Sequence, residues 1–271
     1  LGFNVSRTMQ AAQKLYESGH ITYMRTDSVT LSETALSSIQ KTVKSEFGEK
    51  YSKTRNFFNK NKNAQQAHEA VRPTKFSNNL LNIDSDQSNL YDLIWKRTVA
   101  SQMSDALVDK TIVKIDSDNH EGYFQSEGEV IRFDGFLKLY RESKDDSPQN
   151  EEKNNILPSF SNGETIIKEK IYVTESFSKP PFRYSEASLV KKLEELGIGR
   201  PSTYAPTIST VMNRKYVFKG SNNAKTRDII QYVIDSDVSK KINKENFGSN
   251  KGKLVPSEVG LLVNQFLTSN F

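Results

Sequence analysis

Cysteine is absent from this chain of 271 residues, and so is any long run of apolar residues. Without cysteine, these residues form neither disulfide bonds nor thiolate zinc sites. No apolar run approaches the roughly 18 residues that a membrane-spanning helix needs, and no signal peptide opens the sequence. These absences predict a cytoplasmic protein that has no membrane partner.

Neither sign of charge is in large excess. The chain has 38 Lys and Arg against 33 Asp and Glu, a net charge of +5 and a pI near 9.1. Such a mild excess permits a polyanionic partner without requiring one. The length favours two or three domains. Because the sequence begins at Leu1 without methionine and stops abruptly at Phe271, we expect a fragment of a longer protein.

Helical periodicity dominates the first hundred residues. We expect helices over residues 6–18, 30–48 and 87–103, where apolar residues recur every three to four positions. The second begins with a threonine and a glutamate at capping-box spacing (residues 30–33). Residues 50–66 are polar and basic, which predicts a solvated loop.

From Ala106 the period changes to two. Residues 111–116, 121–133 and 163–177 alternate apolar and polar side chains and are rich in β-branched and aromatic types, which predicts strands. The charge-rich stretch 141–155 has no apolar period and is predicted to be a surface excursion.

Helical signals return after Ser185 and end at Gly197. Pro206 would lie in the first turn of the next helix, so we expect that helix to start later, over residues 208–213. The patterns at 215–219 and 227–234 predict strands. The rest of residues 220–252 shows no pattern that predicts an element.

Two stretches share one layout. "KLYESGHITYMRTDS" (14–28) and "KLEELGIGRPSTYAP" (192–206) each read as a helix, a glycine, a short polar motif and a second helix. A helix, a tight turn and a helix are typical of winged helix-turn-helix domains, and a strand follows the second case.

Tyr23 and Arg25 lie two positions apart in the first of these motifs. In an extended stretch they would share a face. A phenol is a weak nucleophile at neutral pH because it is protonated, and a nearby cation favours the phenolate and stabilises charge on an attacked phosphate. Taken alone, the pair is more simply explained as an amphipathic tyrosine beside a surface arginine.

The motif "HEAVRPT" (68–74) offers His68, Glu69 and Arg72. His68 and Arg72 would share a face of a helix, but Pro73 disfavours helix at Arg72, so a loop or helix end is expected. An arginine stands where the zinc motif His-Glu-x-x-His needs its second histidine, which excludes that site. By itself, His68 is more simply explained as a capping histidine.

The motif "GIGRPSTYA" (197–205) places Arg200, Ser202 and Thr203 where a helix starts. A helix N-terminus with hydroxyls and a guanidinium is a good phosphate site. A plain capping turn explains the same residues.

Taken in order, these motifs closely resemble the bacterial DNA topoisomerase I family, the type IA enzymes. "GHITYMRTDS", "HEAVRPT", "LYDLIWKRTVASQM" and "KPPFRYSEASLVKKLEELGIGRPSTYAPTISTVMNRKYV" carry the resemblance, which spans nearly the whole chain. It is weakest in three stretches that look like lineage-specific loops, 50–66, 141–156 and 218–252.

The resemblance implies an α+β multidomain fold with two catabolite-activator-like, winged helix-turn-helix domains joined by a β-rich arch. We expect a helical domain with the active-site tyrosine over residues 1–105, the arch, which serves as a gate, over 106–178, and a second winged-helix-like DNA-binding domain over 179–271.

The resemblance also implies that Tyr23 attacks a DNA phosphodiester and leaves a 5′-phosphotyrosine and a free 3′-hydroxyl. One ester replaces another, so no ATP is needed. Arg25 matches the arginine that contacts the scissile phosphate, and His68 matches a histidine that lines the active site. The positions expected to contact DNA are Arg200, Ser202, Thr203, Arg214 and Lys215.

In this family an amino-terminal Toprim domain carries an acidic Mg²⁺ cluster, and carboxy-terminal domains bind zinc or DNA. No counterpart of either is evident in the sequence, so we expect no metal site in this fragment and no activity from it alone. The whole protein is expected to be a monomer in the cytoplasm, associated with the nucleoid, that relaxes negatively supercoiled DNA through its single-stranded regions.

Two alternatives come from other classes. A tyrosine recombinase also uses tyrosine and arginine on a phosphate, but its nucleophile usually follows its arginines, whereas Tyr23 precedes Arg200. A non-enzymatic module that binds single-stranded DNA explains the basic pI and the helix-turn-helix layout. It leaves the pairing of Tyr23 with Arg25 unexplained.

Overall fold

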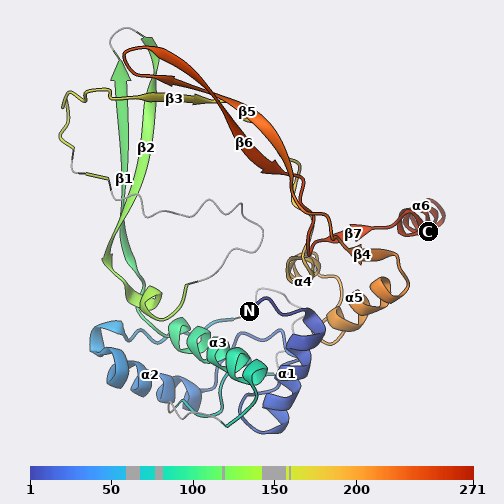
Figure 1. Cartoon of the computed structure of the whole chain (residues 1–271). Coiled ribbons are helices and arrows are strands. Elements are labelled where there is room, and N and C mark those ends of the chain that lie inside the picture. The colour runs from blue at the N-terminus through green and yellow to red at the C-terminus, as the bar shows by residue number, and fades with distance from the viewer. Residues whose placement is uncertain (59–67, 77–81, 118–119, 142–156, 159) are drawn as a thin grey trace. The chain divides into compact units, whose positions relative to one another are not determined.

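A computed structural model describes the chain except for residues 59–67, 77–81, 118–119, 142–156 and 159. The chain divides into two compact units. The first contains residues 1–109, 131–145 and 186–211, and the second contains 110–130, 146–185 and 212–271. Figure 1 shows both helices and long strands, and the fold is therefore mixed α and β. The charge-rich stretch predicted at 141–155 lies, apart from its first residue, outside the described residues.

Helices α1 (Val5–Glu17), α2 (Glu33–Phe47) and α3 (Ser85–Ser101) belong to the first unit. Asn4, Ser32 and Asp84 cap them, each accepting a hydrogen bond from the backbone N–H three residues later. The three helices predicted from the sequence are confirmed, but the predicted cap of the second was wrong. Thr30 stays outside the helix because its carbonyl accepts a hydrogen bond from the N–H of Ala70, and the helix begins only after Ser32.

Two clusters of buried side chains hold these helices together. One is formed by Ala11, Ala12, Leu15, Ile21 and Leu90, and the other by Ala35, Ile39, Val43, Tyr51, Phe76, Trp95, Val99 and Met103. Tyr51, in the short 3-10 helix η1 (Glu49–Tyr51), is only 5% exposed, and its hydroxyl donates to Asp134. The prediction of a solvated loop over 50–66 was therefore wrong at its start, because this aromatic ring fills the core. Residues 59–66 of that loop lie outside the described residues.

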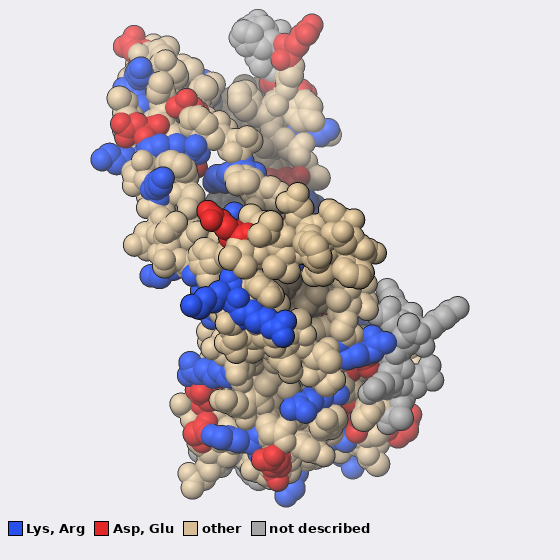
Figure 2. All heavy atoms as spheres, turned by 90° about the vertical axis from the view of Figure 1, so that its right-hand side faces the viewer, with Lys and Arg blue, Asp and Glu red and all other residues tan. Residues whose placement is uncertain are grey.

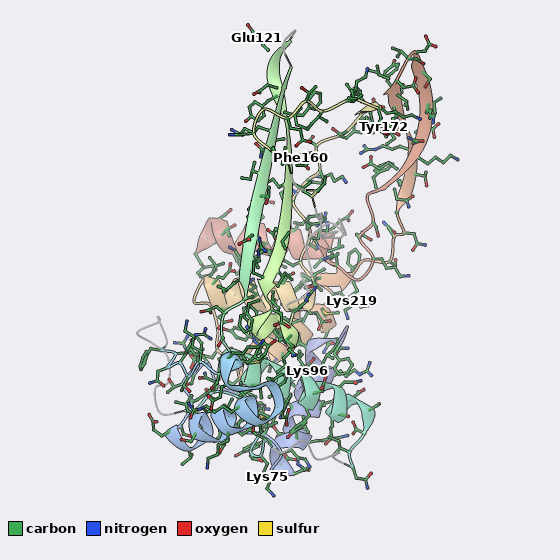
Figure 3. The ribbon with its side chains drawn as sticks, turned by 90° about the vertical axis from the view of Figure 1, so that its left-hand side faces the viewer. Lys75, Lys96, Glu121, Phe160, Tyr172 and Lys219 are labelled. Atoms are coloured by element: carbon green, nitrogen blue, oxygen red, sulfur yellow. The ribbon has the colours of Figure 1, made fainter. Side chains whose placement is uncertain are left out.

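The strands form three small sheets. Strands β1 (Leu107–Ser117) and β2 (His120–Phe133) form a two-stranded ribbon, and β4 (Val217–Lys219) pairs with β7 (Leu254–Pro256). Strands β3 (Ile171–Thr174), β5 (Lys225–Ile234) and β6 (Val238–Phe247) form an antiparallel sheet in the order β3-β5-β6. Figure 3 shows Glu121 near the tip of the ribbon and Tyr172 on β3.

The strands predicted at 111–116, 121–133 and 227–234 are confirmed, but two other predictions were partly wrong. Of residues 163–177, only Ile171–Thr174 form a strand, because only these four pair with β5. The strand predicted at 215–219 begins at Val217, because Lys215 takes a left-handed backbone with a φ of 58°. Residues 218–252, expected to hold an inserted loop, contain the hairpin of β5 and β6.

Three more helices complete the fold: α4 (Glu186–Glu195), α5 (Tyr204–Asn213) and α6 (Glu258–Asn270). The later start predicted for α5 was wrong. Pro206 lies in its first turn, where a backbone N–H has no partner inside the helix, so the missing donor costs little. In the part of the chain that the structure describes, no helix is both long and apolar enough to cross a bilayer.

Candidate active site

The chain leaves α1 through a glycine turn. Gly19 has a φ of 71°, its N–H donates to the carbonyl of Tyr16 at 2.9 Å, and the N–H of His20 donates to that of Leu15 at 2.8 Å. These two bonds are those of the Schellman motif, and the positive φ suits glycine because it has no Cβ. The turn releases the chain into residues 19–32, which we name the tyrosine loop.

The first half of the tyrosine loop pairs with residues 68–74, which we name the histidine segment. The N–H of Thr22 donates to the carbonyl of Arg72 at 2.9 Å, and the N–H of Thr74 donates to that of His20 at 3.0 Å. The Thr22 hydroxyl donates to the carbonyl of Ala70 at 2.8 Å and accepts from the N–H of Arg72 at 2.9 Å. The residue before Tyr23 is therefore fixed through both its backbone and its side chain.

The same segment also holds the far end of the loop. The N–H of Ala70 donates to the carbonyl of Thr30 at 2.8 Å, and the N–H of Ser32 donates to Oε1 of Glu69 at 2.8 Å. The guanidinium of Arg72 forms a bidentate ion pair with Glu69, with two hydrogen bonds of 2.6 and 2.9 Å; we call this pair of bonds the fork. Partial burial acts to raise the pKa of Glu69, but the hydrogen bonds from Arg72 and Ser32 outweigh it, so the pKa lies below its usual value.

Tyr23 lies between two other aromatic side chains. Its ring meets that of Tyr16 edge-on, with centroids 5.2 Å apart, and that of His68 at 6.0 Å with the planes inclined by 32°. Tyr23 and His68 both keep part of their surface exposed. The structure thus brings together two of the predicted site residues, and it adds Tyr16, to which the sequence had not pointed.

Arg25 follows Tyr23 on the same loop and is exposed. The backbone bends at Met24 and Arg25, so the alternation of an extended strand does not align the phenol and the guanidinium. Arg25 makes no hydrogen bond or ion pair with any residue that the structure describes. Its guanidinium is therefore available to an external anion.

The turn after α4 repeats the geometry of the turn after α1. Gly197 has a φ of 67°, its N–H donates to the carbonyl of Glu194 at 3.0 Å, and the N–H of Ile198 donates to that of Leu193 at 2.8 Å. These are again the two bonds of the Schellman motif. The similarity of layout seen in the sequence is thus a similarity of backbone structure.

Arg200 and Thr203 form a capping turn at the start of α5. The N–H of Arg200 donates to the Thr203 hydroxyl at 2.9 Å, and the N–H of Thr203 donates to the carbonyl of Arg200 at 2.8 Å. Their side chains and that of Ser202 are exposed. The simpler explanation from the sequence, a capping turn, describes this geometry, while the exposed guanidinium and hydroxyls remain accessible to a phosphate.

Tyr204 links this turn electrostatically to the tyrosine loop. Burial is the main cause that raises the pKa of Tyr204; the carboxylates of Glu194 and Asp27 add to it, and Arg200 opposes it. Asp27 belongs to the tyrosine loop, so the loop and the start of α5 are close enough for their charges to interact within the first unit. Arg214 and Lys215 are exposed but belong to the second unit.

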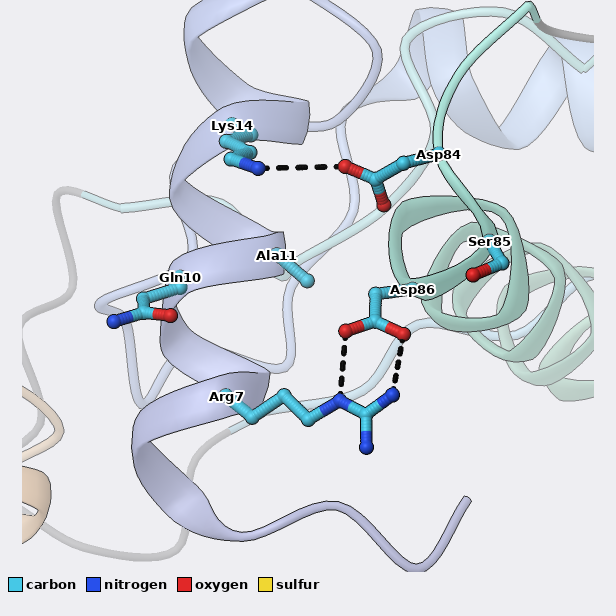
Figure 4. A pocket seen from close by; sticks show the side chains of 7 residues that line it. All are labelled: Arg7, Gln10, Ala11, Lys14, Asp84, Ser85 and Asp86. Atoms are coloured by element: carbon cyan, nitrogen blue, oxygen red, sulfur yellow. Dashed lines mark hydrogen bonds and ion pairs between the residues drawn. The ribbon is translucent and has the colours of Figure 1, made fainter.

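Among the described residues, no group of three or more histidine, aspartate or glutamate side chains is arranged to hold a metal ion. A hollow between α1 and α3 does carry two carboxylates (Figure 4). Asp86 accepts a fork from Arg7 at 2.7 and 2.6 Å, and Asp84 pairs with Lys14 at 3.3 Å. These carboxylates are already paired with basic side chains of α1, so the ion pairs in the hollow connect α1 to the start of α3.

Charge over the surface is mixed in sign. On the face shown in Figure 2, lysine and arginine side chains gather in several patches with acidic groups among them. This pattern agrees with the mild net charge of +5. The functional site is therefore better defined by its local geometry than by the overall charge.

Sequence reasoning missed Glu69 and Arg72 as residues of this site. It considered Arg72 as a possible neighbour of His68 on a helix face and as the residue that excludes a zinc motif, and it gave Glu69 no role of its own. Their opposite charges at a spacing of three residues were the available signal, since such pairs often interact. Their bonds to Ser32 and Thr22 depend on a meeting of distant segments, which no local pattern in the sequence indicates.

Comparisons with known proteins agree on one family. A family model described as DNA topoisomerase matches residues 1–250. The chain is 48% identical over 231 residues to DNA topoisomerase 1 of Rickettsia conorii, covering 80% of this chain and 30% of that protein. It is 42% identical over 294 residues to the prokaryotic-type DNA topoisomerase 1 of Acanthamoeba polyphaga mimivirus, covering 100% of this chain and 34% of that protein.

A solved structure shows the same likeness. Full-length topoisomerase I from Thermotoga maritima superimposes with a TM-score of 0.72 at 33% identity, and the match covers 99% of this chain and 39% of that chain. This chain therefore spans only about a third of the length of the relatives it matches.

Proposed function

The chain belongs to the DNA topoisomerase family whose model matches residues 1–250, and from this we propose that the whole protein relaxes negatively supercoiled DNA. It would act as a type IA enzyme, cutting one strand, passing DNA through the break and resealing it. The observation that carries the proposal is the tyrosine loop, which is tied at both ends by the histidine segment and presents Tyr23 beside His68.

In the proposed reaction the Tyr23 hydroxyl attacks a backbone phosphorus. A bond forms between the phenolic oxygen and phosphorus, and the bond from phosphorus to the 3′ oxygen of the neighbouring nucleotide breaks. The phenolic proton ends on that oxygen, which gives a free 3′-hydroxyl and a 5′-phosphotyrosine. Resealing reverses each step, and because one ester replaces another, no ATP is consumed.

Arg25 would bind the oxygens of the attacked phosphate. Its guanidinium is exposed, and no described residue occupies it. A fixed positive charge near these oxygens stabilises the charge that develops in the transition state. His68 would line the same site, where its ring already lies against that of Tyr23.

The proposed DNA contacts lie on exposed polar residues at both ends of α5: Arg200, Ser202, Thr203, Arg214 and Lys215. A helix N-terminus with hydroxyls suits a phosphate. We expect these residues to bind single-stranded regions, and we expect the protein to act as a monomer on the nucleoid in the cytoplasm.

For the domains we propose a helical, catabolite-activator-like domain over residues 1–105, a β-rich arch over 106–178 and a second winged-helix-like domain over 179–271. The helices α1 to α3, the strands β1 to β3, and α4 and α5 with β4 support this division. In this division the β5–β6 hairpin extends from the third domain into the sheet of the arch, because β5 pairs with β3.

We propose that the whole protein uses Mg²⁺, as its family does, and that residues outside this chain bind the ion. The described residues do not fit such an ion, since they offer no suitable cluster of carboxylates.

The test is covalent capture of DNA by the whole protein. A single-stranded oligonucleotide carrying a label on the 3′ side of the break is incubated with the parent, Tyr23→Phe and Tyr16→Phe, and the products are separated on a denaturing gel. We expect labelled protein from the parent and from Tyr16→Phe, and none from Tyr23→Phe. Tyr16 is the matched control because its ring touches that of Tyr23.

An adduct formed by Tyr23→Phe would show that another residue is the nucleophile. Labelled protein obtained only when the label is moved to the 5′ side of the break would contradict the proposed type IA reaction, which leaves the protein on the 5′ phosphate. Binding without any adduct from the parent would favour the non-enzymatic module.

A further inference from the structure

We propose that Glu69 and Arg72 are positioning residues for the Tyr23 nucleophile, an inference that rests on the proposed function. These two side chains do not touch the phenol. The Glu69 side chain fixes the backbone after the phenol, the Arg72 backbone fixes the residue before it, and the bonds between the two side chains hold these anchors together. Their effect should therefore fall on the rate of DNA cleavage rather than on the affinity for DNA.

The pair joins the two ends of the tyrosine loop. Arg72 holds the near end, where its N–H and carbonyl bind the side chain and the N–H of Thr22. Glu69 holds the far end, where Oε1 accepts from the N–H of Ser32. The fork between Glu69 and Arg72 connects these two anchors directly. Tyr23 and Arg25 both lie between them.

The polar atoms of the pair are already occupied within the protein. Oε1 of Glu69 accepts from Ser32 and from Nε of Arg72, and Oε2 accepts from Nη2. The remaining terminal nitrogen of Arg72, Nη1, donates to the carbonyl of Pro73 at 2.9 Å. The side chains are only 26% and 14% exposed. Three of the five N–H donors of Arg72 are used within the protein and its side chain is largely buried, so these contacts indicate positioning rather than binding of a substrate phosphate.

The pair also controls the neighbour of Tyr23. His68 immediately precedes Glu69, so a shift of Glu69 moves the histidine ring that lies against the phenol. An attacking oxygen must come within about 3–3.5 Å of phosphorus in line with the leaving group, and a misplacement of about 1 Å can cost about 100-fold in rate. The fork therefore fixes the positions of two proposed site residues, Tyr23 and His68, at the same time.

The experiment uses the whole protein with Glu69→Gln and Arg72→Lys, each of which keeps the size of the side chain but weakens the fork. Asp105→Asn is the matched control. Asp105 pairs with Lys53 and Arg55 in the same unit, and none of the three belongs to the tyrosine loop or the histidine segment. Three quantities are measured: the single-turnover rate of adduct formation, the Kd for the same oligonucleotide, and the melting temperature. In a further set, 3-fluorotyrosine replaces Tyr23 and its ¹⁹F resonance is recorded.

We expect Glu69→Gln and Arg72→Lys to slow adduct formation by about 10- to 100-fold with Kd changed by no more than about twofold. Their ¹⁹F resonance should shift or broaden relative to the parent. Asp105→Asn should keep the parental rate and resonance, whatever its melting temperature.

A parental rate and an unchanged ¹⁹F resonance in Glu69→Gln would overturn the positioning role. So would equal slowing in Asp105→Asn at an equal decrease of melting temperature, since reduced stability alone would then explain the effect. Failure of the proposed function gives a different result, because Tyr23→Phe would then form the adduct or the parent would form none.

Discussion

The rings of Tyr23 and His68 lie with their centroids 6.0 Å apart and their planes inclined by 32°. The two residues come from separate segments, the tyrosine loop and the histidine segment, and the backbone pairing of those segments creates the contact. The nucleophile proposed for this family member is thus held by contacts distant in sequence, and substitutions should separate residues that act on the phosphate from residues that hold the fold.

Arg25→Ala in the whole protein should leave the fold intact and slow DNA cleavage. Arg25 is exposed and makes no bond to a described residue, so the melting temperature should hardly change. Removal of one charged donor to the transition state typically slows a reaction by about 100- to 1,000-fold. Single-turnover adduct formation and a melting curve measure the two effects. A large decrease of melting temperature with cleavage per folded molecule intact would show that Arg25 is structural.

Arg200→Ala should weaken binding of single-stranded DNA and reduce its dependence on salt. Each phosphate that the protein no longer neutralises makes the plot of log K against log salt shallower by about 0.7 for a single strand. Titrations at several salt concentrations give the slope. Lys192→Ala is the control, because Lys192 is already paired with Glu195 on α4 and should change the slope less. Equal slopes for Arg200→Ala and the parent would contradict direct phosphate binding by Arg200.

The cap of α3 should show a pH dependence at low pH. The N–H and the side chain of Gln87 donate to Asp84 and lower its pKa to about 2. Because the folded pKa is depressed, the stability from this carboxylate is present above the unfolded pKa of about 4 and disappears as pH falls toward 2. Urea unfolding from pH 6 to pH 2 measures it for the parent, Asp84→Ala and Asp84→Asn.

Asp84→Asn still caps the helix but does not titrate. The difference in the free energy of unfolding between the parent and Asp84→Ala should therefore decrease as pH falls. The difference between Asp84→Asn and Asp84→Ala should stay constant. Parallel pH curves for all three proteins would show that Asp84 contributes no pH-dependent stability.

Gly260→Ala should destabilise the protein, opposite to the usual effect in a helix. Alanine normally stabilises a helix interior by about 1 kcal/mol relative to glycine. Gly260 lies in α6, and a Cβ there would overlap the carbonyl oxygen of Tyr216, so backbone would have to move. Thr268→Ala, at an exposed position of the same helix, should have a small effect. Thermal melting compares them, and a raised melting temperature for Gly260→Ala would contradict the close approach.

Local signals account for the elements that the sequence predicted. The apolar periodicity of α1 to α3 and the β-branched run of β5 depend on neighbouring residues, so they can be read without knowing what packs against them. Strand β6 was missed because it contains Lys240, Lys241 and Lys244 and has no alternation. Such an edge strand is defined by its pairing with β5, and lysines there discourage further pairing.

The sequence by itself determined which residues form the motifs: Tyr23 and Arg25, His68, and Arg200 with Thr203. It also determined the two glycine turns, because a left-handed turn strongly favours glycine and the positions of Gly19 and Gly197 are visible in the chain. Only the tertiary structure decided that the histidine segment ties both ends of the tyrosine loop. The bonds from Glu69 to Ser32 and from Arg72 to Thr22 join residues distant in sequence, and no local propensity encodes such a contact, since it exists only once the helices have packed.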